Sequence, residues 1–151
     1  MAAPLRIYLD TCAINRLTDD SSQPRVRLEA EAVERFFRAV QSGEVFWITS
    51  SIVEQEIRRD PNARRREDAL AMLVHAREFH FPSAMAADRA RSLKAIGYGE
   101  LDALHLAVAE DSRVDFLLTT DDRFLRQASR RLGNPFVRVA NPLDYAQEAK
   151  P

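Results

Sequence analysis

Short runs of apolar, β-branched and aromatic residues alternate with longer segments of helical periodicity along the chain. We expect strands in the apolar runs, at 5–9, 45–49, 79–81, 116–119 and 136–140. We expect helices in the longer segments, at 24–42, 60–77, 83–96, 99–110 and 122–132, and a short helix that begins at 51. Parallel strands need such crossover segments between them, and the crossovers cover both faces of the sheet. The alternation therefore predicts an α/β fold, a three-layer sandwich around a parallel sheet.

Length and composition favour one folded domain over residues 1–151, with a core from about 5 to 145. Apolar residues make up 46% and charged residues 30%, which is typical of globular proteins. Cys12 is the single cysteine, so an internal disulfide is excluded. The first residues lack the pattern of a secretory leader, and no segment approaches the about 18 apolar residues of a membrane span. We therefore expect a cytoplasmic protein with no membrane partner.

Two acidic residues directly follow predicted strands. Asp10 follows the strand at 5–9, and Asp121 follows the strand at 116–119. Ligands bind at the carboxyl edge of open α/β sheets, so both positions are candidates for a site. Asp10 is equally well explained as the N-cap of a turn that begins at Thr11. Asp122 lies nearer the following helix, and we expect it to help cap that helix while Asp121 serves the site.

The helix that begins at Ser51 offers two acidic residues, which helical geometry separates. At about 100° per residue, one stripe of this helix carries the apolar side chains Ile52, Val53 and Ile57. Glu56 falls inside that stripe, whereas Glu54 lies on the opposite side and is positioned to close a capping box with Ser51. We therefore expect Glu54 to be structural and Glu56 to have a functional role.

Asp102 stands in a helix that is apolar on nearly every side, LDALHLAVA over 101–109. The helix dipole favours an acid in the first turn, but Glu100 already occupies such a position. His105 lies three residues after Asp102, on the same side of the helix. A single histidine in this setting is more often a packed core residue than a ligand, and that is the favoured interpretation.

Four acidic residues on four separate elements therefore point to one edge of the sheet: Asp10, Glu56, Asp102 and Asp121. Clustered carboxylates repel one another and resist ionisation. Mg²⁺ or Mn²⁺ removes this conflict, because both ions accept oxygen ligands and retain bound water. Such an ion activates water and neutralises charge on a phosphate, which predicts metal-assisted phosphodiester hydrolysis.

Four segments together resemble the motifs of PIN-domain ribonucleases, in particular the VapC-type toxins of bacterial toxin–antitoxin pairs. The segments are 7–15, 50–57, 101–107 and 118–124. In the first, an acid is followed by a hydroxyl residue and later an asparagine. The second places an acid before an aliphatic residue, which again selects Glu56. The fourth is a Thr-x-Asp followed by an aromatic residue. The resemblance extends from Ile7 to about Tyr145.

The resemblance implies a five-stranded parallel sheet in the order 3-2-1-4-5 and Mg²⁺- or Mn²⁺-dependent cleavage of RNA. It makes the four acids the catalytic and metal-binding cluster, with Asp10 and Asp102 as direct ligands. It assigns supporting roles to three polar residues, Thr11, Asn15 and Thr119. It also implies a cognate antitoxin protein as partner and a homodimer.

Segment 18–25 departs from the shortest toxins of this kind and lies beside two arginines. Arg16 and Arg25 are candidates for contact with RNA phosphates. Pairing with Asp19 and Asp20 is an equally good interpretation. The net charge of -1 argues against indiscriminate binding of nucleic acid, although local basic faces are compatible with it.

Two other functions remain open at this stage. The chain also fits a PIN ribonuclease of housekeeping RNA processing that has no antitoxin. It fits, less well, a catalytically silent PIN-like binding module. The four acids argue against the silent module, because unpaired buried carboxylates destabilise a fold.

Overall fold

The computed structural model describes residues 3–148, which include a five-stranded sheet whose strands are all parallel. The strands are β1 (Leu5–Leu9), β2 (Val45–Ser50), β3 (Glu78–His80), β4 (Phe116–Leu118) and β5 (Arg138–Ala140). Their order in the sheet is β3-β2-β1-β4-β5, so the predicted parallel sheet and its order are confirmed. β1 occupies the centre, and the strand order reverses between β1 and β4. Ligand sites of open α/β sheets form at such a point.

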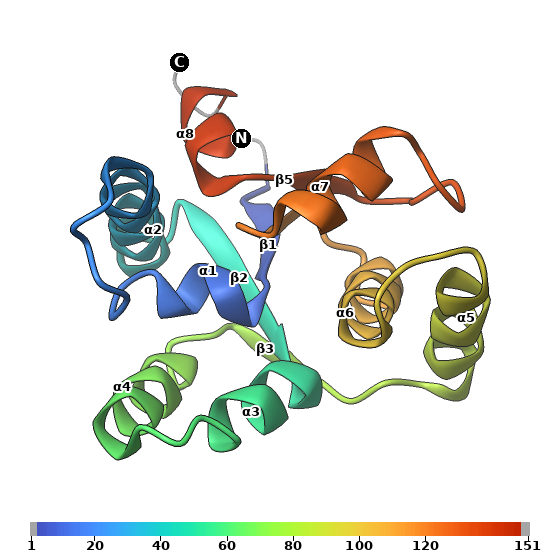
Figure 1. Ribbon diagram of the computed structural model, residues 1–151, viewed down its shortest axis with the longest axis horizontal. Coiled ribbons are helices and arrows are strands. Elements are labelled where there is room, and N and C mark those ends of the chain that lie inside the picture. Colours follow the sequence, from blue (N-terminus) through green and yellow to red (C-terminus); the bar gives the residue numbers. More distant parts are fainter. Residues whose placement is uncertain (1–2, 149–151) are drawn as a thin grey trace.

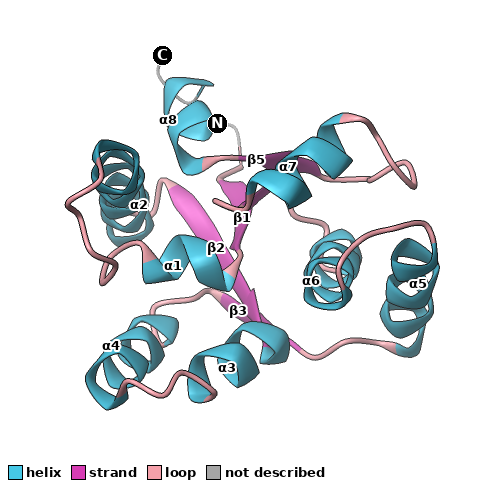
Figure 2. Ribbon diagram, in the orientation of Figure 1, coloured by secondary structure: helices cyan, strands magenta, loops and turns pink. Residues whose placement is uncertain are grey.

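Helices cover both faces of this sheet, as the alternation of segments predicts. They are α1 (Thr11–Asn15), α2 (Pro24–Ser42), α3 (Ser51–Arg58), α4 (Ala63–Leu73), α5 (Ala84–Ala95), α6 (Glu100–Asp111), α7 (Asp122–Ser129) and α8 (Pro142–Glu148). Figure 1 shows α2 and α4 on one side of the sheet and α5 and α6 on the other. The strands lie between these two helical layers in Figure 2. The three-layer α/β sandwich is confirmed.

The core is built around the central strands, which are buried on both faces. Ile7, Tyr8 and Leu9 of β1 are fully buried, and so is Trp47 of β2. Continuous apolar runs of this kind are typical of strands covered by helices on both sides. Phe37 of α2 packs edge-to-face on Trp47 with the ring centroids 4.9 Å apart. This packing holds α2 against the body of β2.

α3 begins at Ser51 as predicted, but its N-cap lies one residue earlier than expected. Ser50, not Ser51, is the N-cap, and its hydroxyl accepts a hydrogen bond from the backbone N–H of Val53. Glu54 does not close a capping box with Ser51 but forms a surface ion pair with Arg58, one helical turn later. Glu54 is therefore structural, as predicted, through a different contact.

The start of α4 also differs. The sequence predicts a helix over 60–77, but α4 begins at Ala63. Asn62 is the N-cap, and its side chain accepts a hydrogen bond from the backbone N–H of Arg65. Asp60 instead accepts from the N–H of Asn62 and pairs with the Arg65 guanidinium. Asn62 serves as N-cap because its side-chain oxygen accepts a hydrogen bond from one of the free backbone N–H groups at the start of the helix.

The carboxyl-terminal part of the chain holds three further differences. α7 ends at Ser129 rather than Leu132, and β5 is shorter than the predicted strand. α8 is not predicted by the sequence, because its seven residues carry no clear apolar period.

Within residues 3–148, no helix is both long and apolar enough to cross a membrane. Met1 and Ala2 lie outside the described residues, so the expectation of no leader stays a prediction.

Candidate metal centre

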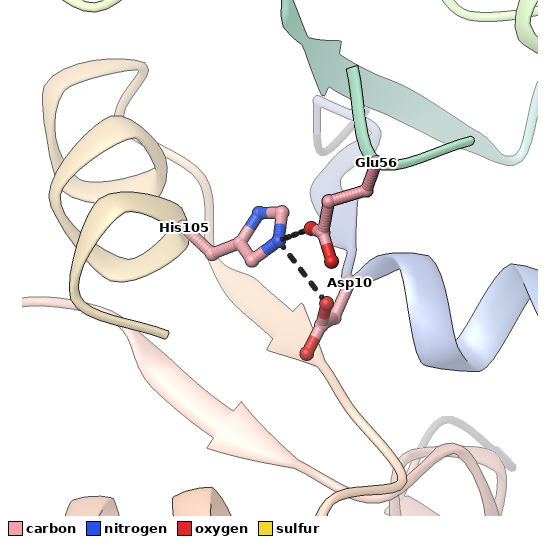
Figure 3. A group of neighbouring side chains, drawn as sticks. All are labelled: Asp10, Glu56 and His105. Carbon is pink, nitrogen blue, oxygen red and sulfur yellow. Dashed lines mark hydrogen bonds and ion pairs between the residues drawn. The ribbon is translucent and has the colours of Figure 1, made fainter. Parts of the chain in front are cut away.

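Three side chains from three separate elements converge at the carboxyl end of β1. Figure 3 shows Asp10 at the end of β1, Glu56 on α3 and His105 on α6, all pointing toward one another. One ligand atom from each residue lies within 4.8 Å of the others. The Nε2 atom of His105 is 3.2 Å from Asp10 Oδ1 and hydrogen-bonds Glu56 Oε1. Because the three residues are far apart in sequence, the fold itself assembles this cluster.

Asp10 occupies the backbone N-cap position of α1, but its carboxylate does not cap the helix. The backbone N–H of Asp10 donates to the carbonyl of Leu118 at 2.9 Å, which ties the end of β1 to β4. The carboxylate is almost fully buried and accepts a hydrogen bond from Thr119 Oγ1 at 2.9 Å. The side chain therefore belongs to the cluster, and the N-cap explanation holds for the backbone alone.

Glu56 reaches the cluster from the buried stripe of α3, as helical geometry predicts. Thr11 Oγ1 donates a hydrogen bond to Glu56 Oε1 at 3.0 Å. Burial alone raises the pKa of Glu56, but the hydrogen bond and positive charge of His105 outweigh it. The Thr11 hydroxyl and the Arg59 charge act in the same direction, so the net pKa is lowered. Glu56 is therefore held as a carboxylate.

His105 is buried, as expected of a packed core residue, yet both of its ring nitrogens are engaged. Nδ1 lies 2.7 Å from the Tyr8 hydroxyl, which in turn lies 2.7 Å from the hydroxyl of Ser50. Burial lowers the pKa of His105, but the charge of Asp10 and the hydrogen bond to Glu56 raise it above its ordinary value. The sequence interpretation missed these contacts. The signal for them was the position of His105 on the Asp102 side of the helix.

Asp102 lies close to this cluster but is not one of its three members. Burial raises the pKa of Asp102 to about 7, and the negative charges of Asp10 and Asp121 contribute further. Burial is the main cause of this shift, and the neighbouring negative charges add to it, as expected where carboxylates crowd together. The structure thus groups Asp10 with Glu56 and His105, whereas the resemblance implies Asp10 and Asp102 as the direct ligands.

Asp121 caps the helix that follows it, a role that the sequence predicts for its neighbour Asp122. It is the N-cap of α7, and its Oδ1 accepts hydrogen bonds from the backbone N–H groups of Arg123 and Phe124 at 2.9 and 3.1 Å. The prediction that Asp122 caps this helix is therefore wrong. Asp122 points elsewhere and forms a two-pronged ion pair with Arg25 at 2.7 and 2.8 Å.

Arg16 and Arg25 both have carboxylate partners. Arg16 pairs with Asp19 at 2.6 Å and with Glu29 at 3.0 Å. Arg25 pairs with Glu29 at 3.4 Å, in addition to its contact with Asp122. The expected pairing of this region with Asp19 is found for Arg16. A role of either arginine in RNA binding stays a prediction.

The polar residues with predicted supporting roles take different places. Thr11 and Thr119 each donate a hydrogen bond to a carboxylate of the cluster, to Glu56 and Asp10 respectively. Asn15 instead lines a separate cavity of about 380 Å³ together with Met72 of α4. Cys12 Sγ lies 3.2 Å from Thr119 Oγ1, and burial raises the pKa of its thiol to about 12. Cys12 is therefore a protonated packing residue.

The donor set of the cluster fits a divalent cation. Two carboxylates supply hard oxygen ligands, which suit both Mg²⁺ and Mn²⁺. The imidazole nitrogen adds a ligand that suits transition metals such as Mn²⁺ better than it suits Mg²⁺. Tyr8 holds the second ring nitrogen of His105, and hydrogen bonds of this kind orient metal-binding histidines.

Three solved structures with the same overall arrangement are similar to this chain. "FitAcB" from Neisseria gonorrhoeae has 15% identity and a TM-score of 0.59, covering 90% of this chain and 97% of that one. VapBC from Salmonella typhimurium, bound to DNA, has 19% identity and a TM-score of 0.58, covering 91% and 98%. VapC20 from Mycobacterium tuberculosis is described as a toxin that cleaves the sarcin–ricin loop. It has 17% identity and a TM-score of 0.58, covering 78% of this chain and 92% of that one. At these identities the likeness shows a shared fold.

Sequence comparison gives the family directly. No curated protein sequence matches this chain. The model of the PIN domain family matches residues 7–129, which include most of β1, all of β2 to β4, and the three residues of the cluster, Asp10, Glu56 and His105. The chain belongs to the PIN domain family.

Proposed function

We propose that this protein is an endoribonuclease that hydrolyses RNA phosphodiester bonds with the help of Mg²⁺ or Mn²⁺. The observation that carries the proposal is the convergence of Asp10, Glu56 and His105, with ligand atoms within 4.8 Å of one another. Membership in the PIN domain family and the fold shared with VapC20 support the same activity. Asp102 and Asp121 complete the proposed acidic site.

One group of residues would bind the cation, and a second group orients the side chains of the first. Asp10, Glu56 and His105 would hold the cation, and the negative charge of Asp102 nearby would favour its binding. A bound divalent cation lowers the pKa of a water molecule and neutralises charge on the phosphate. Thr119 and Thr11 fix the orientation of Asp10 and Glu56 by hydrogen bonds, so that their oxygens need little rearrangement.

The proposed reaction is a simple hydrolysis. The oxygen of a water molecule bonds to phosphorus, the bond from phosphorus to the leaving oxygen breaks, and the water gives up a proton while the leaving oxygen gains one. Asp10 and His105, beside the proposed reaction centre, are almost fully buried. Charges in such a setting interact more strongly than in water.

We further propose that the activity is that of a toxin controlled by an antitoxin protein. Solved structures with this fold include VapBC and FitAB, each bound to DNA. A homodimer remains part of this proposal. The antitoxin distinguishes it from a housekeeping PIN ribonuclease, which needs no inhibitor.

Cleavage of single-stranded RNA tests the enzymatic part. We expect cleavage in Mn²⁺ or Mg²⁺, none with a chelator, and none by the Asp10→Asn variant. Asp111→Asn, an exposed acid at the other end of α6, is the matched control and should cleave normally. Cleavage without metal, or full activity of Asp10→Asn, would contradict the mechanism.

Growth of a bacterial host tests the toxin part. We expect tightly controlled expression of the wild-type chain to stop growth, and co-expression of the product of the adjacent gene to restore it. The Asp10→Asn variant should be harmless at equal expression. Active enzyme that leaves growth unaffected would favour the housekeeping ribonuclease.

A further inference from the structure

A hollow adjoins the candidate metal centre between α3 and the start of α6. Its volume is about 390 Å³, and its walls come from these two helices. We propose that this hollow is a nucleoside subsite, which binds the nucleoside next to the phosphate held at the metal centre. The proposal rests on the proposed function for the identity of its ligand, and on the hollow itself for its position.

Glu56 connects the two sites. Its Oε1 atom accepts from Thr11 and contacts His105 in the cluster, while its side chain also lines the hollow. A ligand in the hollow therefore lies directly beside the proposed metal centre. In a nucleic acid chain the sugar and base are covalently adjacent to the phosphate, so a phosphate at the cluster brings one nucleoside to this wall.

One part of the hollow is apolar. Ile52 of α3 is nearly buried, and Leu104 and Leu101 of α6 complete this surface. Leu101, in the first turn of α6, is 40% exposed and so leaves apolar surface open to a ligand. The flat face of a base gains free energy by covering such a surface, because apolar area is removed from water.

The other part of the hollow is polar and differs in character from residue to residue. Gln55 offers an amide donor and a carbonyl acceptor, Arg59 offers donors only, and Glu100 offers acceptors only. Unstacked bases are recognised through such donors and acceptors along their edges. A site for phosphate alone would not need Gln55 or Glu100, so the lining favours a nucleoside.

The size of the hollow sets the extent of the ligand. Pockets for small ligands range from about 300 to 1000 Å³, and this hollow lies near the lower limit. It therefore suits one nucleoside and not a run of several nucleotides. One subsite of this kind selects the base at a single position beside the cleaved bond.

Binding of nucleotides tests the subsite without any cleavage. The probes are the four nucleoside 5′-monophosphates, titrated into metal-free protein and followed by NMR of the Leu101 and Leu104 methyl groups and the Gln55 amide. We expect at least one nucleotide to shift these signals with saturation. Arg59→Ala and Gln55→Ala should each weaken that binding by about tenfold, because each removes hydrogen bonds to the ligand.

Arg58→Ala is the matched control for these variants. Arg58 precedes Arg59 on α3, is equally a surface arginine, pairs with Glu54 and does not line the hollow. Nucleotide affinity should be unchanged in this variant. Absence of shifts at the three reporter residues, or an unchanged affinity in both Arg59→Ala and Gln55→Ala, would overturn the subsite.

Cleavage of an RNA pool of random sequence separates this proposal from the proposed function. We expect wild type to prefer one base at one position beside the cut, and Gln55→Ala and Arg59→Ala to lose most of that preference. Cleavage with an unchanged preference in both variants overturns the subsite and leaves the ribonuclease intact. Nucleotide binding at the hollow without RNA cleavage by wild type supports the subsite and overturns the ribonuclease.

Discussion

Two regions of the molecule bury carboxylates, and they neutralise them differently. In the first, Glu29 of α2 is completely buried and contacts Arg16, Arg25 and Asn141. Two arginines, which are always charged, surround this single carboxylate. Asp19 and Asp122 in turn pair with the same arginines. Every charge in this region has a fixed partner within the protein.

At the candidate metal centre, the negative charges do not all have positively charged partners. Asp10 and Glu56 share one histidine, and Asp102 adds a further carboxylate nearby. No arginine or lysine pairs with Asp10 or Glu56 in the described part of the chain. Burial of a charge alone is thus no sign of function. An excess of negative charge that the protein does not compensate is such a sign, because it leaves room for a cation.

The largest difference between the regions should appear in activity. We expect Asp10→Asn to lower the rate of RNA cleavage by about 10³-fold or more, because several kcal/mol of charge stabilisation are lost. The unfolding free energy of this variant should not fall, since the mutation relieves carboxylate crowding. Single-turnover cleavage assays and urea denaturation measure the two quantities. A variant that unfolds more easily and cleaves normally would remove the distinction between the regions.

The opposite result is expected for Glu29→Gln. Removing one partner of a buried ion pair should lower the unfolding free energy by about 3 kcal/mol, because two arginines lose their common carboxylate. Glu31→Gln, an exposed position on the same helix, is the control and should be neutral. Urea denaturation measures both. Below its unfolding midpoint, Glu29→Gln should retain most RNA cleavage, and loss of cleavage in fully folded protein would contradict the structural role.

Part of this contrast is readable in the sequence and part is not. The stripe of α3 distinguishes Glu56 from Glu54, and the structure places Glu56, not Glu54, beside Asp10 and His105, because helical period alone decides which side of the helix each side chain is on. The parallel sheet likewise follows from the alternation of segments. Glu29 attracts no notice in the sequence, since two of its three partners come from 13 residues before it and 112 after it.

The exchange of roles between Asp121 and Asp122 shows the limit of local patterns. Both residues are able to cap α7 from their position, and only the ion pair of Asp122 with distant Arg25 decides between them. His105 is a similar case. Its burial follows from the apolar helix, whereas its contact with Asp10 depends on how α6 docks against β1.

The pH dependence of stability sharpens the comparison further. His105 has a raised pKa, so its stabilising effect is complete below the unfolded value of about 6.5 and is lost as pH rises through the folded value. Asp102, with a pKa raised to about 7, binds its proton more tightly in the folded state. Its contribution likewise falls as pH rises from about 4 to 7.

Both effects have the same sign. In chelator, the unfolding free energy should decrease between pH 5 and pH 8 by on the order of 1 kcal/mol. Asp102→Asn should flatten the lower part of this decrease, and Mn²⁺ should oppose it. Glu56 has a lowered pKa and stays ionised throughout this window, so it does not contribute. Thermal unfolding across the pH range tests this, and stability that rises with pH would contradict the assignment.

The smallest effect is expected at Arg25, which is half exposed. Arg25→Gln breaks its surface pair with Asp122 and should lower the unfolding free energy only slightly, because exposed ion pairs contribute little to stability. If Arg25 also contacts an RNA phosphate, the salt dependence of RNA binding should weaken by about 0.7 in the slope of log K against log salt. Fluorescence titrations at several salt concentrations measure the slope. An unchanged slope would assign Arg25 to the Glu29 region alone.

Titration of Mn²⁺, followed by electron paramagnetic resonance, tests directly whether Asp10, Glu56 and His105 bind a cation. Wild type should bind Mn²⁺ saturably, and Glu56→Gln should weaken that binding by at least about tenfold, since one ligand is lost. Asp111→Asn should bind like wild type. Equal Mn²⁺ affinity in wild type and Glu56→Gln, or no saturable binding by wild type, would show that Asp10, Glu56 and His105 do not hold a cation.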